Sequence, residues 1–220
     1  GSLLLILILI VTVVEIFTPY FVYIIAPGFI ENDVKFNLAV ELTRITFPFL
    51  LFVSLSSFFS GILNSNNKFA AAAAAPIILN LVLILSLVVS YKLNLNVAKQ
   101  LSYGVTLAGI LQLIFLFFVT LKFYKPTLIF NYKSDNNVKS FFKKLLPSIF
   151  SSGITQINIL IGTIIASFET GAVSYLYYAD RIYQINLAIA GIAVGTVSLP
   201  ALSKAFKNRN IKKLSNIQNK

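Results

Sequence analysis

Apolar residues fill six long stretches of this chain, and short polar segments separate them. The stretches cover residues 3–26, 44–63, 70–90, 100–121, 145–167 and 174–200. Each is close to the ~20 residues that an α-helix needs to cross a hydrocarbon core of ~30 Å. The apolar residues cover every face of these helices, and the alternation typical of β-barrel strands is absent. The pattern therefore predicts an all-α membrane bundle of about six transmembrane helices.

The composition agrees with a membrane protein and removes several kinds of chemistry. The chain is 57% hydrophobic and 11% charged, whereas soluble domains have ~45–50% apolar and ~25% charged residues. It has no Cys and no His, which excludes disulfides, thiolate or imidazole zinc sites and Ser-His or Cys-His catalytic pairs. Phosphate-binding loop patterns are also missing. We therefore expect no catalytic residues, no enzyme activity, no metal site and no cofactor.

The basic residues predict how the chain is oriented. If the chain crosses the membrane six times, one side receives the start of the chain, the joints 64–69 and 122–144, and the tail. That side holds thirteen of the 18 Lys and Arg residues. The other side receives four, namely Lys35, Arg44, Lys92 and Lys99. Because Lys-rich and Arg-rich loops stay in the cytoplasm, we expect both ends to be cytoplasmic. This distribution accounts for the net charge of +11 without nucleic-acid binding, for which no basic groove with aromatic residues is evident.

Polar residues inside the fifth stretch are informative, because each is costly in lipid unless it is paired or hydrated. Ser148, Ser152 and Thr155 recur at helical spacing and form one stripe. Two interpretations remain open. The stripe either makes hydrogen bonds between helices or lines a water-filled cavity.

The sixth stretch carries an arginine, Arg181, which is expensive near the centre of a bilayer. Ser174, Tyr177 and Gln184 share its helical face, while Asp180 points about 100° away. One interpretation is that a carboxylate on another helix neutralises Arg181 and fixes packing. The other is that the guanidinium faces a cavity and binds an anion, since its planar fork suits phosphate. We take these five residues as candidate substrate-binding residues.

Three further features of the apolar stretches allow predictions about charge pairing, a kink and helix contacts. Glu15 is either a proton carrier or the buried partner of a basic group. Pro19 lies well inside the first stretch and predicts a kink. Gly191 and Gly195 form a GxxxG pair, which permits close approach of two helices.

Two sets of short motifs resemble one transporter family. The first set comprises Phe47-Pro48-Phe49, Gly61-Ile62-Leu63-Asn64-Ser65 with Lys68-Phe69, Ala75-Pro76 and Leu79-Asn80. The second comprises Ala166-Ser167-Phe168, Gly171-Ala172-Val173-Ser174, Tyr177-Tyr178-Ala179-Asp180-Arg181, and Gly195-Thr196 through Leu199-Pro200-Ala201-Leu202-Ser203. Together they resemble the MurJ (MviN) lipid II flippases of the multidrug/oligosaccharidyl-lipid/polysaccharide exporter superfamily, nearly from end to end.

The resemblance implies a fold and a domain layout. The family has 14 spans in two lobes around a central cavity, and this chain resembles spans three to eight. Residues 1–122 would then be the last four helices of the N-terminal lobe. A cytoplasmic basic linker would follow over 123–144, then the first two helices of the C-terminal lobe over 145–200 and a basic cytoplasmic tail over 201–220. The implied location is the bacterial inner membrane.

The resemblance also implies an activity, by which lipid II crosses the membrane through alternating access while basic residues hold its pyrophosphate. The arginine of the family motif corresponds to Arg181, and Ser174 matches a cavity-facing position. Gln184 stands where several relatives have an acid, and Gly162 stands where some have a sodium-linked aspartate, which removes the support for sodium coupling. The expected ligands are lipid II and membrane lipids.

Two alternatives stay open at this stage. The protein is a flippase for another polyprenyl-linked saccharide, or the chain is a truncated membrane module without transport activity. The chain lacks Met and begins with Gly1-Ser2, so we expect a piece of a longer protein.

Overall fold

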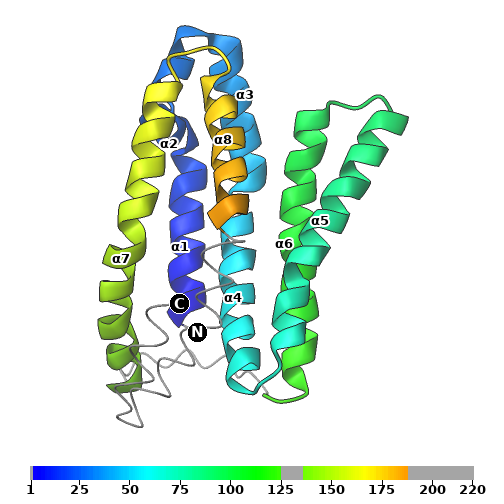
Figure 1. Ribbon diagram of the computed structural model, residues 1–220, viewed down its shortest axis with the longest axis vertical. Coiled ribbons are helices and arrows are strands. Elements are labelled where there is room, and N and C mark those ends of the chain that lie inside the picture. The colour runs from blue at the N-terminus through cyan, green and yellow to red at the C-terminus, as the bar shows by residue number, and fades with distance from the viewer. Residues whose placement is uncertain (1, 125–135, 188–220) are drawn as a thin grey trace, which may run out of the picture. The chain divides into compact units, whose positions relative to one another are not determined.

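The computed structural model describes residues 2–124 and 136–187 (Figure 1). Every regular element in this part of the chain is a helix: α1 (Ser2–Ile16), α2 (Thr18–Ile25), the 3₁₀ helix η1 (Pro27–Glu31), α3 (Asp33–Thr46), α4 (Phe49–Ser65), α5 (Phe69–Lys92), α6 (Val97–Leu121), α7 (Asn136–Ala166) and α8 (Ala172–Leu187). The chain divides into two compact units, residues 1–164 and 165–220, and α8 belongs to the second. The all-α fold class is confirmed.

Helices of membrane-spanning length account for most of the first unit. Asp33–Ser65, Phe69–Lys92 and Val97–Leu121 are each long and apolar enough to cross a bilayer, and the bent pair α1–α2 makes a fourth if the two helices are counted as one span. The expected fifth stretch lies in α7. The sixth is described only as far as Leu187, and the tail 201–220 lies outside the described residues.

The second span begins earlier than the sequence predicts. The apolar run starts at residue 44, but α3 and α4 together form one span from Asp33 to Ser65. The Asn32 side chain caps the start of α3, accepting a hydrogen bond from the Lys35 backbone N–H at 3.0 Å. Glu41 of α3 is neutralised by Lys99 of α6 at 2.6 Å. Capping and charge pairing therefore extend the helix beyond its apolar part.

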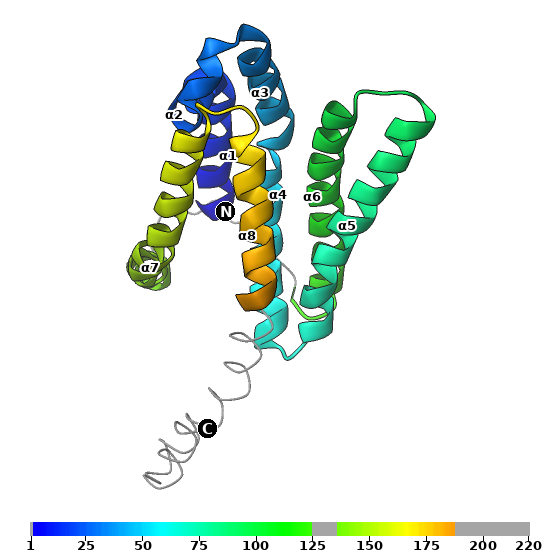
Figure 2. The ribbon, with the colours of Figure 1, turned by 45° about the horizontal axis from the view of Figure 1, so that its top comes forward.

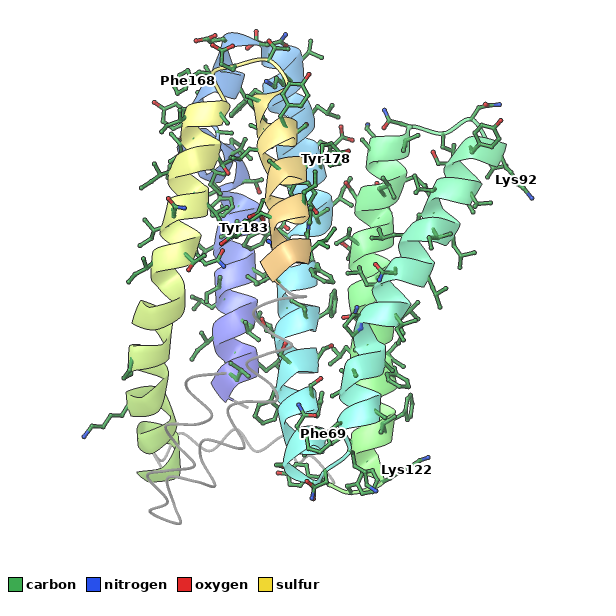
Figure 3. The ribbon with its side chains drawn as sticks, viewed as in Figure 1. Phe69, Lys92, Lys122, Phe168, Tyr178 and Tyr183 are labelled. Atoms are coloured by element: carbon green, nitrogen blue, oxygen red, sulfur yellow. The ribbon has the colours of Figure 1, made fainter. Side chains whose placement is uncertain are left out.

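The connections alternate between the two ends of these four spans. The start of α1, the turn between α4 and α5 and the end of α6 lie at one end, while η1 and the α5–α6 loop lie at the other (Figure 1). Figure 3 places Phe69 and Lys122 at the first end and Lys92 at the second. This is the alternation that the six-span prediction requires of its first four spans.

The first stretch, 3–26, is broken at Phe17, close to Pro19, where the sequence predicts a kink. The axes of α1 and α2 differ by 84°. Pro19 has no backbone N–H, so the Glu15 carbonyl lacks its normal helical donor. The Thr18 hydroxyl replaces that donor, donating to the Val14 and Glu15 carbonyls at 2.9 Å each. Thr18 is 1% exposed, so the break is internally satisfied.

Two glycines let α6 pack closely between its neighbours. A Cβ on Gly104 would lie 2.4 Å from the Ser86 Oγ of α5, and a Cβ on Gly109 would lie 2.6 Å from the Phe49 ring of α4. The antiparallel pair of α5 and α6 is visible in both ribbon views (Figure 1 and Figure 2). Leu116 of α6 joins Leu63 and Ala75 in a buried apolar cluster. These contacts make α6 the central helix of this part of the first unit.

Candidate functional site on helix α8

A glycine turn sets the start of the helix that carries the arginine motif. Gly171 has φ = 80°, a backbone conformation that side chains disfavour. Its carbonyl accepts the first helical hydrogen bond, from the Tyr175 N–H at 3.1 Å. Gly171 therefore provides the turn from which α8 begins.

Arg181 pairs with the tyrosine one turn before it. Its Nη2 donates to the Tyr177 Oη at 2.7 Å, and its Cζ lies 4.8 Å from the centroid of the same ring. Four residues separate the two, which places them one above the other on a helix. The predicted common face is thus confirmed for Tyr177 and Arg181.

Asp180 and Gln184 form a separate pair. The Gln184 Nε2 donates to the Asp180 Oδ2 at 2.5 Å. This pairing draws the Gln184 side chain toward Asp180 although we predicted that it shares the face of Arg181. Ser174, at the start of the same helix, has an exposed side chain.

The two pairs leave the guanidinium charge uncompensated within the described part of α8. Among the described residues, no carboxylate lies within 4.0 Å of the Arg181 guanidinium as an ion-pair partner. The ion pair found there joins Lys99 and Glu41, which lie on other helices. A guanidinium has five N–H donors in a fixed plane, and the Tyr177 contact uses one donor atom. The remaining donors suit a bidentate contact with a phosphate or carboxylate.

The polar stripe of the fifth stretch lies on α7. The side chain of Thr155 is exposed, whereas the side chains of Ser148 and Ser152 lie outside the described residues. Thr163, farther along the helix, donates its hydroxyl to the Ile159 carbonyl at 2.9 Å. Whether the stripe lines a cavity or bonds to another helix stays a prediction.

Glu15 lies directly before the break in the first span. Its Oε1 is buried and has no hydrogen-bond partner among the described residues. No ion pair within 4.0 Å joins Glu15 to a described basic residue, so both interpretations of Glu15 stay open. The described residues contain no cluster of three potential metal-binding side chains.

Sequence reasoning missed the contacts that join α3 to α6. The Lys99–Glu41 ion pair and the hydrogen bond from the Thr106 hydroxyl to the Ile45 carbonyl connect these two helices. The partners are about sixty residues apart, and a single sequence carries no signal that pairs them. The small residues Gly104, Ala108 and Gly109 were the available hint that α6 is central.

The fold defines a class of protein. The long apolar helices and their alternating connections are those of a multi-pass membrane protein. A comparison with known families then identifies it further: the family described as "Lipid II flippase MurJ" matches residues 1–220. The chain belongs to this family, which is one of transporters.

Individual relatives agree with the family match. The chain is 41% identical to the probable lipid II flippase MurJ of Rhizobium tropici over 232 residues, which cover 100% of this chain and 42% of the relative. It is 42% identical to that of Rickettsia prowazekii over 97% of this chain and 42% of the relative. A Helicobacter pylori protein of the same name is 35% identical over 84% of this chain and 44% of its own length. The chain thus spans about two fifths of these relatives.

Proposed function

We propose that the protein to which this chain belongs is a lipid II flippase. It moves undecaprenyl-pyrophosphate-linked disaccharide-peptide from the cytoplasmic to the periplasmic leaflet of the bacterial inner membrane. The support is the family match over residues 1–220 and the names of the relatives. Because the chain covers about two fifths of those proteins, the activity is assigned to the whole protein.

The observation that carries this proposal is the state of the Arg181 guanidinium. It is stacked on Tyr177, and no described carboxylate forms an ion pair with it. A diphosphate presents several charged oxygens, which match a planar fork of N–H donors. We assign Arg181 to the pyrophosphate and Tyr177 to holding its fork in place.

The neighbouring residues have supporting roles in this assignment. Ser174 provides a hydroxyl for the headgroup, and the Asp180–Gln184 pair keeps the carboxylate from neutralising Arg181. Ser148, Ser152 and Thr155 line the hydrated path. Alternating access moves the headgroup through differential binding to inward-facing and outward-facing states, with no covalent step.

The layout follows the family's two lobes. Residues 1–122 belong to the N-terminal lobe, 123–144 to a cytoplasmic linker, 145–200 to the C-terminal lobe and 201–220 to a cytoplasmic tail. The concentration of basic residues on one side supports this orientation, with both ends of the chain cytoplasmic.

Charge reversal in the full-length protein tests the assignment. Cells that depend on an Arg181→Glu variant are expected to stop growing and to accumulate lipid II in the inner leaflet. Lys92→Glu is the matched control, because Lys92 is an exposed cation at the end of α5 (Figure 3). Normal lipid II translocation by the Arg181→Glu variant would overturn the proposal. Preferential transport of another polyprenyl-linked saccharide would redirect it to that substrate.

A further inference from the structure

An open groove of about 410 Å³ lies on the first unit, between α3, α5 and α6. Ile45 of α3 and Ser86 of α5 line it, and α6 supplies the remaining lining residues between Gln100 and Ile110. None of these residues belongs to the candidate site on α8. The groove therefore calls for an explanation of its own.

The walls of the groove are held by specific contacts. The Thr106 hydroxyl donates to the Ile45 carbonyl, and Lys99 pairs with Glu41, so α6 is tied to α3. On the other side, Gly104 brings α6 against Ser86 of α5, leaving no room for a Cβ. Both walls of the groove are thus in direct contact with α6.

The groove covers the depth of one leaflet. Gln100 lies in the first turn of α6, and Ile110 lies ten residues deeper. At ~1.5 Å per residue this separation is ~15 Å, which is half of a ~30 Å hydrocarbon core. The groove therefore begins near the membrane surface and ends near the middle of the bilayer.

The lining of the groove is polar near the membrane surface and apolar deeper in the bilayer, as a lipid molecule is. Gln100 and Tyr103 stand at the end near the surface, and Tyr103 is 57% exposed. Leu107 and Ile110 form the deep end. Ser86, 8% exposed, lies between them, and its hydroxyl makes no hydrogen bond within the described residues. A free hydroxyl at this level can donate to an ester carbonyl.

We propose that this groove binds one acyl chain of a membrane phospholipid, with the ester and headgroup at the Gln100–Tyr103 end. An empty apolar groove in a bilayer forfeits packing contacts that a hydrocarbon chain supplies. The bound lipid fills the groove lined by α3, α5 and α6. This binding is independent of the proposed transport activity.

Native mass spectrometry of the full-length protein, purified from membranes and washed with delipidating detergent, tests this inference. The wild-type protein is expected to retain phospholipid. Leu107→Trp fills the groove and is expected to reduce retained phospholipid about tenfold, the effect of displacing about two methylene groups. Ile114→Trp is the matched control, because Ile114 is exposed two turns along the same helix and does not line the groove. No retained phospholipid in the wild type, or equal retention in both variants, would overturn the inference.

A photocrosslinker gives a second measurement that does not depend on filling the groove. Tyr103→p-benzoylphenylalanine keeps an aromatic ring at the entrance. Irradiation of the delipidated protein is expected to yield an adduct with a phospholipid. An adduct with a polyprenyl phosphate, a crosslink to another segment of the protein, or no adduct overturns the assignment. Because neither experiment measures transport, failure here is distinguishable from failure of the flippase proposal.

Discussion

The guanidinium of Arg181 lies over the ring of Tyr177 and donates to its hydroxyl at 2.7 Å. A tyrosine supports an arginine without cancelling its charge, unlike an aspartate or glutamate. Such a cation–π contact contributes ~0.5–1 kcal/mol when exposed and ~2 kcal/mol or more when desolvated. The pair therefore holds the fork in one orientation while its charge stays available to a ligand.

The geometry of the fork, and not the charge alone, is expected to matter for transport. In the full-length protein, Arg181→Lys keeps the charge but loses the bidentate donors, and we expect lipid II translocation to fall about tenfold or more. Tyr177→Phe keeps the stacked ring and loses one hydrogen bond, so the loss is expected to stay below about tenfold. Rates in reconstituted vesicles measure both. Wild-type activity of Arg181→Lys would contradict the role given to the fork.

The Thr18 hydroxyl is expected to stabilise the break in the first span. Thr18→Val removes the donor that replaces the missing Pro19 N–H, leaving the Glu15 carbonyl unpaired, at a cost of about 1 kcal/mol in the free energy of unfolding. Thr43→Val is the control, because the Thr43 hydroxyl bonds to the Ala39 carbonyl within an unbroken helix. Unfolding in mixed micelles measures the two variants. Equal effects would mean that the Thr18 hydroxyl has no special role.

The close approach of α5 and α6 depends on Gly104. Gly104→Ala would place a Cβ 2.4 Å from the Ser86 Oγ and 3.0 Å from its Cβ, and we expect a loss of about 1–3 kcal/mol in stability. Gly61→Ala on α4 is the control, because no atom lies within 4 Å of the added Cβ; it is expected to be neutral or slightly stabilising.

A second substitution checks the origin of that loss. Ser86→Gly removes both clashing atoms, so the double variant Gly104→Ala/Ser86→Gly is expected to recover part of the stability lost in Gly104→Ala. No recovery in thermal unfolding would place the strain elsewhere.

The ion pair of Lys99 and Glu41 is expected to contribute little to stability. Its side chains are 41% and 47% exposed, and such pairs are typically worth ~0.2–1 kcal/mol. Glu41→Gln should therefore destabilise the protein by less than about 1 kcal/mol, and less still at high salt. Unfolding at two salt concentrations measures this. A larger effect that is independent of salt would indicate a desolvated pair.

Local rules read from the sequence predicted several features correctly. The lengths of the apolar runs predicted the three helices that are long enough to span a membrane, Pro19 predicted the break near Phe17, and helical spacing placed Tyr177 beside Arg181. Each depends on residues within about one turn or on the composition of one segment. The site as a whole is still a prediction, because Ser148 and Ser152 have no described side chains.

Features that depend on two distant segments were not predictable in the same way. The GxxxG pair at Gly191 and Gly195 lies outside the described residues, so that prediction stays open. The close contacts in the described part are at Gly104 and Gly109, where partners from other helices decide the fit. The early start of the second span goes with the Asn32 cap and with the ion pair between Glu41 and Lys99, and the partners of that ion pair are far apart in the sequence.

The sequence by itself determined that this is a multi-pass helical membrane protein, and its motifs pointed to the lipid II flippase family. Hydrophobic length, charge placement and helical periodicity are local properties of the chain, so they can be read residue by residue. Only the tertiary structure decided that α6 packs between α4 and α5 and that a groove opens beside it. Those outcomes depend on which side chains meet across tens of residues, and steric fit between helices is absent from a linear pattern.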